Sequence, residues 1–164
     1  MENETKIKLL RIIEKDSRIS IKDLAIQLGQ SEDDVTKTLA KMEKEGIVAG
    51  YHSLINWEKT GIEKVTALIH VKVCPQKDDG FSRIADKICK YTEVYDVTLI
   101  SGDYDFLVTI EGKTLQEVAD FVHTKLAPID GVVSTSTNFI LQKYKEHGKK
   151  YNNKNNKERI VVTP

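Results

Sequence analysis

Apolar residues recur at every third or fourth position in three stretches of the first 46 residues. The stretches cover residues 4–15, 21–28 and 32–45, and their apolar members are Ile7, Leu10, Ile12 and Ile13, then Ile21, Leu24, Ala25 and Leu28, then Val35, Leu39 and Met42. This spacing places apolar side chains along one side of a helix. The pattern therefore predicts three short amphipathic helices.

The second and third predicted helices follow each other closely. Ser20 and Ser31 each stand three residues before an aspartate, which is typical of a helix start, and Gly29 is typical of a helix end. Because only residues 29–31 separate the two helices, they must cross at a steep angle. This arrangement is a helix-turn-helix, which indicates DNA binding.

The third predicted helix has a positively charged side. Its apolar residues occupy one face, so lysines spaced four and three residues apart emerge together on another face, where they are suited to contact phosphates. Threonines beside them are small enough to reach base edges in a major groove. We expect the DNA-binding residues to be Ser31, Thr36, Lys37, Thr38, Lys41 and Lys44.

The same lysines are also compatible with an ordinary solvated helix face, which is the usual role of a charge run. Glu32, Asp33 and Asp34 occupy the first turn of this helix. They stabilise the positive helix end but repel DNA phosphates. The acidic start therefore favours modest affinity for DNA.

The residues after Gly46 predict a small wing. Ile47–Tyr51 and Ser53–Ile55 have the composition of two short strands, which would extend the surface that faces DNA. Tyr51 and Trp57 fit packing roles better than base stacking.

From Val65 onward the apolar spacing changes from helical to alternating. Residues 65–73 alternate apolar and polar side chains, which predicts a half-buried strand. A helix is predicted around residues 81–88, strands over 94–100 and 105–111, and a second helix over 115–126 that is capped by Thr114 and Glu117. A last strand is predicted over 132–141, with one face formed by Val133, Thr135, Thr137, Phe139 and Leu141. The βαββαβ order predicts an α+β domain with a four-stranded antiparallel sheet and both helices on one side.

The other side of this predicted sheet has no cover. Leu68, His70 and Leu107 fall on that side and are too apolar for comfortable exposure. A second copy of the chain would cover them, so a homodimer is predicted. A dimer would also hold two recognition helices about one DNA turn apart, as a palindromic site requires.

The formal net charge is zero, but the charge is unevenly distributed. Residues 1–61 carry 10 basic and 11 acidic side chains, residues 62–141 carry 8 and 12, and residues 142–164 carry 7 and 2. Only the last segment is basic. It is predicted to be a solvated linker over 142–159, and its apolar end, residues 159–164, is expected to dock as an added edge strand.

Several functional classes find no support in the sequence. No apolar run is long enough for a membrane helix, and residues 1–16 lack the apolar middle of a signal peptide, so a cytoplasmic protein is expected. Cys74 and Cys89 have no CxxC spacing and are expected to stay reduced, and the four histidines have no metal-ligand spacing. With no P-loop or dinucleotide fingerprint either, the sequence predicts a protein that is not an enzyme and needs no metal or cofactor.

Four segments in order resemble the Lrp/AsnC (leucine-responsive or feast/famine) family of transcriptional regulators over most of the chain. They are DLAIQLGQSEDDVTKTLAKMEKEGIVAGY, the break near INWEKTG, SGDYDFLVTIEG and GVVSTSTNFIL. The resemblance implies a ferredoxin-like regulatory domain, dimers that assemble into tetramers or octamers, and an amino-acid effector bound between dimers. In the family a Gly-Asp-Tyr-Asp hairpin supplies the effector site, which here corresponds to Gly102, Asp103, Tyr104 and Asp105.

This effector site makes chemical sense for an amino acid. Either aspartate would pair with the ammonium group, and a glycine turn exposes backbone N–H groups for the carboxylate. Ser134, Thr135 and Ser136 would add hydroxyl groups from the last strand. The alternative is an ordinary hairpin turn and a strand with good β-propensity.

Together these patterns predict four regions: a winged helix-turn-helix over 1–55, a linker over 56–63, a dimerising and effector-sensing domain over 64–142, and a basic tail over 143–164. The predicted function is a sequence-specific transcriptional regulator that binds double-stranded DNA and responds to an amino acid. The alternative is a ligand-sensing or protein-interaction module with weak or lost DNA binding.

Overall fold

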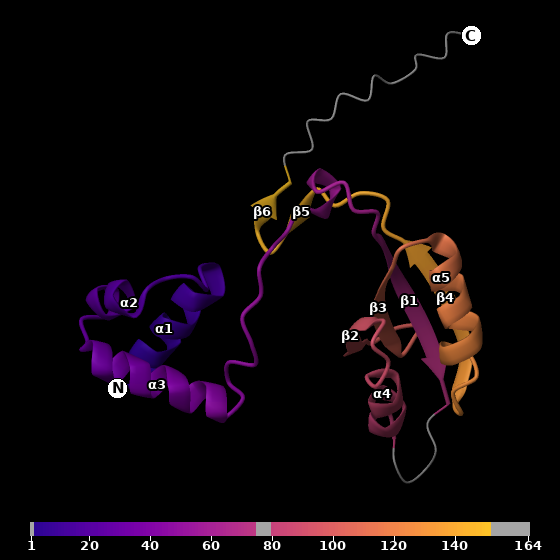
Figure 1. The fold of residues 1–164 in the computed structure, drawn as a ribbon. Coiled ribbons are helices and arrows are strands. Elements are labelled where there is room, and N and C mark those ends of the chain that lie inside the picture. The colour runs from indigo at the N-terminus through magenta and orange to yellow at the C-terminus, as the bar shows by residue number, and fades with distance from the viewer. Residues whose placement is uncertain (1, 75–79, 152–164) are drawn as a thin grey trace. The chain divides into compact units, whose positions relative to one another are not determined.

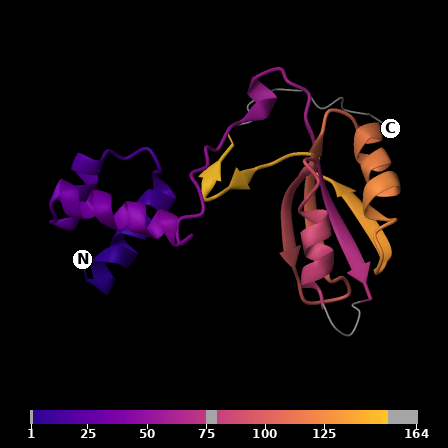
Figure 2. The same cartoon turned by 60° about the horizontal axis from the view of Figure 1, so that its bottom comes forward.

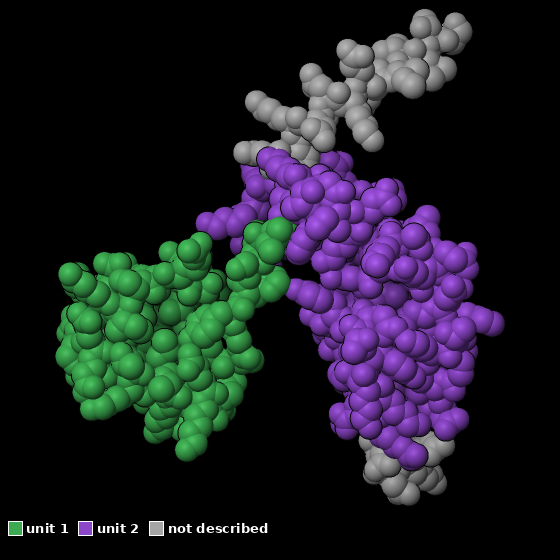
Figure 3. Space-filling model, in the orientation of Figure 1, with its two compact units in different colours: residues 1–55 green, residues 56–164 purple. Residues whose placement is uncertain are grey.

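The structure, a computed structural model, describes residues 2–74 and 80–151. The chain divides into two compact units, residues 1–55 and 56–164 (Figure 3). Among the described residues, none of the helices has the length and apolar character needed to cross a membrane.

The first unit contains the three predicted helices, which confirms their prediction (Figure 1). They are α1 (Asn3–Lys15), α2 (Ile21–Leu28) and α3 (Glu32–Lys44). Their core is formed by Leu9, Ile13, Leu24, Ala25, Val35 and Met42. The expected stripe of α1 is partly wrong, because Leu9 is buried while Ile7 is 51% exposed. Several apolar residues are adjacent in this part of the sequence, so more than one face of α1 could be buried. Packing buries the face that carries Leu9 and Ile13, which are four residues apart.

The turn between α2 and α3 is held by both predicted caps. Ser31 accepts a hydrogen bond from the backbone N–H of Asp34 at 3.1 Å, and Ser20 does the same for Asp23 at 3.0 Å. Gly29 has a left-handed backbone with φ of 62°, which ends α2. The predicted helix-turn-helix is confirmed.

The prediction of two wing strands is wrong: residues 47–55 contain no strand. The backbone N–H groups of Ile47 and Val48 both bond to the carbonyl of Met42, so this segment first folds back on the end of α3. An isolated two-stranded hairpin is only marginally stable in water, so little stability is lost when these residues do not pair as strands.

The second unit has the predicted βαββαβ order. Its elements are β1 (Val65–Val73), α4 (Ser82–Ile88), β2 (Val94–Leu99), β3 (Phe106–Gly112), α5 (Leu115–Phe121) continued by the π-helical turn η2 (Val122–Leu126), and β4 (Val132–Phe139). The strands form an antiparallel sheet in the order β2-β3-β1-β4 (Figures 1 and 2). This topology confirms the predicted sheet.

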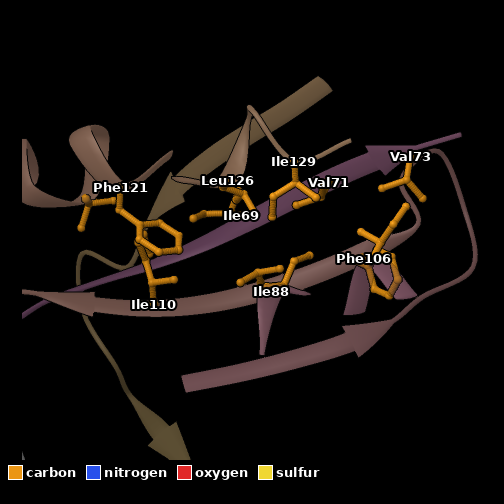
Figure 4. Packing of buried hydrophobic residues seen from close by; sticks show 13 residues of the cluster. Ile69, Val71, Val73, Ile88, Phe106, Ile110, Phe121, Leu126 and Ile129 are labelled. Atoms are coloured by element: carbon orange, nitrogen blue, oxygen red, sulfur yellow. The ribbon is translucent and has the colours of Figure 1, made fainter. Parts of the chain in front are cut away.

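One face of the sheet forms the core with both helices (Figure 4). Alternate residues of β1 and β3, including Ile69 and Phe106, pack against Ile88 of α4 and Phe121 of α5. Because α4 and α5 contact the same alternate set of strand residues, they lie on the same side of the sheet, as predicted.

The predicted inward face of β4 needs one correction. A register shift between Lys72 and Val73 of β1 brings Val132 against the core and leaves Val133 65% exposed. Beyond the shift, Thr135 lies opposite Val71, on the helix side as expected. The irregularity adds a residue locally, so the alternation counted along the sequence fails for Val133.

Residues 56–151 hold further small elements. A 3-10 turn, η1, spans Trp57–Lys59, and the tail forms an antiparallel hairpin of β5 (Lys145–Glu146) and β6 (Lys149–Lys150). The prediction of a solvated linker over 142–159 is therefore wrong for the residues that form β5 and β6. The proposed edge strand over 159–164 lies outside the described residues.

Candidate nucleic-acid interface and effector site

The three lysines of α3 are exposed, but two of them pair with nearby carboxylates, one within α3 and one on Glu45, the residue that follows it. Lys37 Nζ lies 2.5 Å from Asp33 Oδ2, and Lys41 Nζ lies 3.7 Å from Glu45 Oε1. The side chain of Lys37 is 74% exposed. Exposed pairs of this kind contribute between nothing and about 1 kcal/mol, so a phosphate is able to replace the carboxylate.

The hydroxyl groups expected to meet DNA have local partners. The Thr36 hydroxyl donates to the carbonyl of Glu32 at 2.7 Å, and the Ser31 hydroxyl donates to Asp34 Oδ2 at 2.7 Å. Thr38 is half-buried. Such short-range hydrogen bonds are typical of serine and threonine near a helix start.

Tyr51 has a partner that the sequence did not predict. Its hydroxyl donates to Glu43 Oε1 of α3 at 2.7 Å, although the ring is half exposed. This hydrogen bond to a carboxylate is the largest of the effects that raise the pKa of Tyr51 to about 12. Tyr51 therefore stays protonated and ties the segment after α3 to that helix.

The predicted effector hairpin separates its two aspartates. Asp103 is exposed in the connection between β2 and β3, next to Gly102 with φ of 134°. Asp105 turns inward, where its carboxylate accepts a hydrogen bond from the backbone N–H of Val73 at 2.8 Å. Lys72 Nζ lies 3.7 Å from the same carboxylate oxygen. Asp105 is thus occupied within the sheet, whereas Asp103 is accessible.

Tyr104 belongs to a polar cluster on the sheet face that the helices do not cover. Its ring centroid lies 5.4 Å from that of His70, and Asn138 Nδ2 lies 3.2 Å from His70 Nδ1. Ser136 lies opposite His70 in the register of β1 and β4. Sequence reasoning placed His70 on this face but not in the site, and it missed Asn138. Strand alternation on β4 was the signal for Asn138, because it shares a face with Ser136.

The three predicted residues of β4 fall on two sides of the sheet. Ser134 and Ser136 lie opposite Lys72 and His70 on the uncovered face. Thr135 lies opposite Val71 and faces the helices. The hydroxyl of Thr135 is therefore directed away from the other candidate residues.

No group of three or more histidine, cysteine, aspartate or glutamate side chains is arranged to hold a metal within residues 2–74 and 80–151. Cys74 and Cys89 are free and exposed.

Two family models match this architecture. Residues 2–49 match winged helix-turn-helix DNA-binding domains, and residues 66–149 match the Lrp/AsnC ligand binding domain. The second match alone covers half of the chain. The two domains follow each other in the same order as the segments that resemble the Lrp/AsnC family in the sequence. The chain belongs to the Lrp/AsnC family. It is a DNA-binding transcriptional regulator.

Two transcriptional regulators are similar to this Lrp/AsnC chain over most of its length. The HTH-type transcriptional regulator YugG of Bacillus subtilis is 42% identical over 99% of this chain and 98% of its own. The HTH-type transcriptional regulator LrpA of Pyrococcus horikoshii is 33% identical over 84% of this chain and 94% of its own. These relatives have the names of regulators rather than of enzymes.

Solved structures share the fold of this Lrp/AsnC chain. A Neisseria meningitidis transcriptional regulator in complex with L-Met superimposes with a TM-score of 0.69 at 24% identity, covering 89% of this chain and 94% of that one. AsnC of E. coli gives a TM-score of 0.65 at 19% identity, with coverage of 89% and 96%.

Proposed function

We propose that this regulator reads an operator as a homodimer through α3 and that an amino acid bound near the β2–β3 connection modulates this binding. The single observation that carries the DNA part is the exposed face of α3, which holds Lys37, Lys41 and Lys44 directly after a tight, capped turn. A helix presented in this way is the element that enters the major groove in helix-turn-helix proteins.

The expected DNA contacts of α3 divide by chemistry. The lysines exchange weak intrahelical partners for phosphates, which positions the helix without reading sequence. Thr36 and Thr38 are the candidates for base edges, since both are short and flank Lys37. Ser31 acts by holding the helix start, because its side chain is already bonded to Asp34.

A second copy would cover the open face of the sheet. Leu68, His70 and Leu107 are half-buried there, and their positions alternate with the buried core residues of β1 and β3. Pairing two such faces removes this apolar surface from water. A two-fold dimer would match a palindromic operator, because its two recognition helices are related by the same symmetry as the two half-sites. The family resemblance implies further assembly to a tetramer or octamer.

The effector proposal is supported by the accessible polar groups around Tyr104. Asp103 would pair with the ammonium group of an amino acid, and backbone N–H groups at Gly102 would bind its carboxylate. Ser134 and Ser136 lie on the uncovered face with His70, whereas Asp105 and Thr135 have roles inside the domain. The L-Met in the Neisseria meningitidis structure belongs to a protein of the same fold and favours an amino acid as the ligand class.

The DNA part is tested by gel shift of a duplex from the chain's own promoter at several salt concentrations. Lys37→Ala or Lys41→Ala should weaken binding and reduce the salt slope by about 0.9 for each phosphate that is no longer neutralised. Lys8→Ala is the matched control, because Lys8 forms a similar exposed pair with Glu4 on α1. Wild-type affinity in both α3 variants would exclude this face.

The effector part is tested by thermal unfolding with each of the twenty common amino acids. A ligand that binds the folded state raises the midpoint with increasing concentration. Asp103→Ala should abolish that rise, whereas Asp86→Ala, an exposed aspartate on α4, should leave it intact. If no amino acid moves the midpoint, the hairpin is a plain turn.

A ligand-sensing module with weak DNA binding is the second candidate. The observation that favours it is the pairing of Lys37 and Lys41 with carboxylates of α3 and its neighbouring residue. A midpoint rise with an amino acid, together with no duplex binding at low salt, would support this alternative.

A further inference from the structure

The β5–β6 hairpin brings lysines together in the only basic part of the chain. Lys145 lies directly opposite Lys150, and Glu146 lies opposite Lys149. His147 and Gly148 connect the strands with φ of 43° and 77°. Two consecutive residues with positive φ are typical of the tight turn that matches the twist of a hairpin. The register is therefore well defined by the turn.

The hairpin is stabilised by hydrogen bonds, two of which occupy the carboxylate of Glu146. The backbone N–H of Tyr151 donates to the carbonyl of Tyr144 at 3.0 Å, which extends the ladder by one pair. Glu146 accepts from the Tyr151 hydroxyl and from Lys143 Nζ, the latter at 2.7 Å. Burial and Glu146 raise the pKa of Tyr151 to about 12, so its hydroxyl keeps donating at neutral pH. Glu146 therefore has two partners already.

The lysines on the other face of the hairpin lack such a partner among the residues that the structure describes. Lys145 and Lys150 are exposed, and neither forms an ion pair within the part of the chain that the structure describes. Directly opposed residues on one face have Cβ atoms about 4.5–5.5 Å apart, and like charges in that arrangement are destabilising. An anion between the two ammonium groups would reverse this repulsion.

The distribution of charge shows why such an anion site matters. Residues 1–141 carry 18 basic and 23 acidic side chains, whereas residues 142–164 carry 7 and 2. Even α3 has four carboxylates against three lysines. Sequence-independent affinity for DNA comes from basic side chains that neutralise phosphates. Because acidic side chains outnumber basic ones in residues 1–141, that part of the chain contributes little of this affinity.

We propose that the β5–β6 hairpin binds the phosphate backbone of duplex DNA through Lys145 and Lys150 and supplies much of the sequence-independent affinity. This inference rests on the proposed function, since it assigns the electrostatic part of the same DNA binding to a second element.

The test compares variants of the full chain by fluorescence anisotropy with two labelled duplexes, one from the chain's own promoter and one of unrelated sequence. Lys145→Gln/Lys150→Gln should weaken binding to both by a similar factor and lower the salt slope by up to about 1.8 per protomer, because two phosphates per protomer are no longer neutralised. Lys145→Arg/Lys150→Arg keeps the charge and should bind like the wild type.

A matched control separates a local effect from net charge. Lys90→Gln/Lys113→Gln removes the same charge from exposed positions elsewhere in the second unit and should leave the slope unchanged. An unchanged slope in the hairpin variant, or an equal fall in the control, overturns the inference. In either case binding by the wild type keeps the proposed regulator standing, whereas a wild type that binds neither duplex at low salt removes both.

Discussion

The carboxylate of Asp105 accepts a hydrogen bond from the backbone N–H of Val73 at 2.8 Å, although the two residues are 32 positions apart. Strand β3 begins at Phe106, which pairs with Val71, so β3 offers no backbone carbonyl to Val73. The side chain of Asp105 takes the place of the missing strand. Hydrogen bonds from a buried N–H to a carboxylate are among the stronger ones in proteins.

Asp105→Ala should therefore lower the free energy of unfolding by about 1–3 kcal/mol, because the Val73 N–H loses its acceptor. Urea unfolding followed by circular dichroism measures this difference. Asp103→Ala is the matched control, since Asp103 is exposed, and its effect should stay within about 0.5 kcal/mol. Equal stability of the two variants would contradict the structural role of Asp105.

Gly131 and Gly102 provide a second matched pair. Both have positive φ, 95° and 134°, but a Cβ at Gly131 would lie 2.8 Å from Ile84 Cδ1 while one at Gly102 meets nothing within 4 Å. Gly131→Ala should cost more stability than Gly102→Ala by about 1–2 kcal/mol, because Ile84 must move within the core. Thermal unfolding of the two variants decides this, and an equal loss would mean that backbone strain alone matters.

Ser31→Ala should destabilise the first unit by about 1 kcal/mol, because the backbone N–H of Asp34 loses its cap. Ser31→Thr keeps a hydroxyl and should recover most of the loss. Hydrogen exchange of the α3 amides reports the change locally. Ser53→Ala, in the exposed segment after α3, should have no measurable effect. If Ser31→Ala behaved like Ser53→Ala, the cap would contribute nothing.

The pair of Glu93 and Lys125 should make stability depend on acid pH. The hydrogen bond from Lys125 is the main cause that holds the pKa of Glu93 below its usual 4.5 in the folded state. The stabilisation is therefore present above pH 4.5 and is lost as the pH falls through the lowered pKa. Both groups are partly exposed, so we expect less than about 1 kcal/mol.

The measurement for Glu93 is urea unfolding of wild type and Glu93→Gln between pH 3 and 7. The wild type should be the more stable protein at pH 7, and the difference should disappear near pH 3. Glu63→Gln, an exposed glutamate before β1, is the control. A constant difference across this range would show that the pair does not titrate as described.

Local patterns were enough to predict most elements. Ser20, Ser31 and Thr114 each mark a helix start in the sequence and cap one in the structure. These predictions succeed because a cap involves residues only three positions apart, and strand alternation needs only neighbouring positions. The helix-turn-helix and the four-stranded sheet follow from such short-range rules together with the handedness of crossovers.

Long-range interactions decided the rest. Nothing near Asp105 in the sequence indicates that its carboxylate would reach Val73, and nothing near Val133 reveals the register shift that exposes it. The missing wing strands and the β5–β6 hairpin likewise depend on where backbone groups find partners.

Sequence alone thus determined which residues form helices and strands and which family the chain resembles, because periodicity and capping are encoded within a few positions. Tertiary structure alone determined which candidate side chains are available to a ligand. Asp103 and Asp105 are two residues apart and chemically identical, yet one is exposed and the other completes the sheet. The physical reason is that a backbone N–H at the end of one strand must be satisfied by a group from elsewhere in the chain.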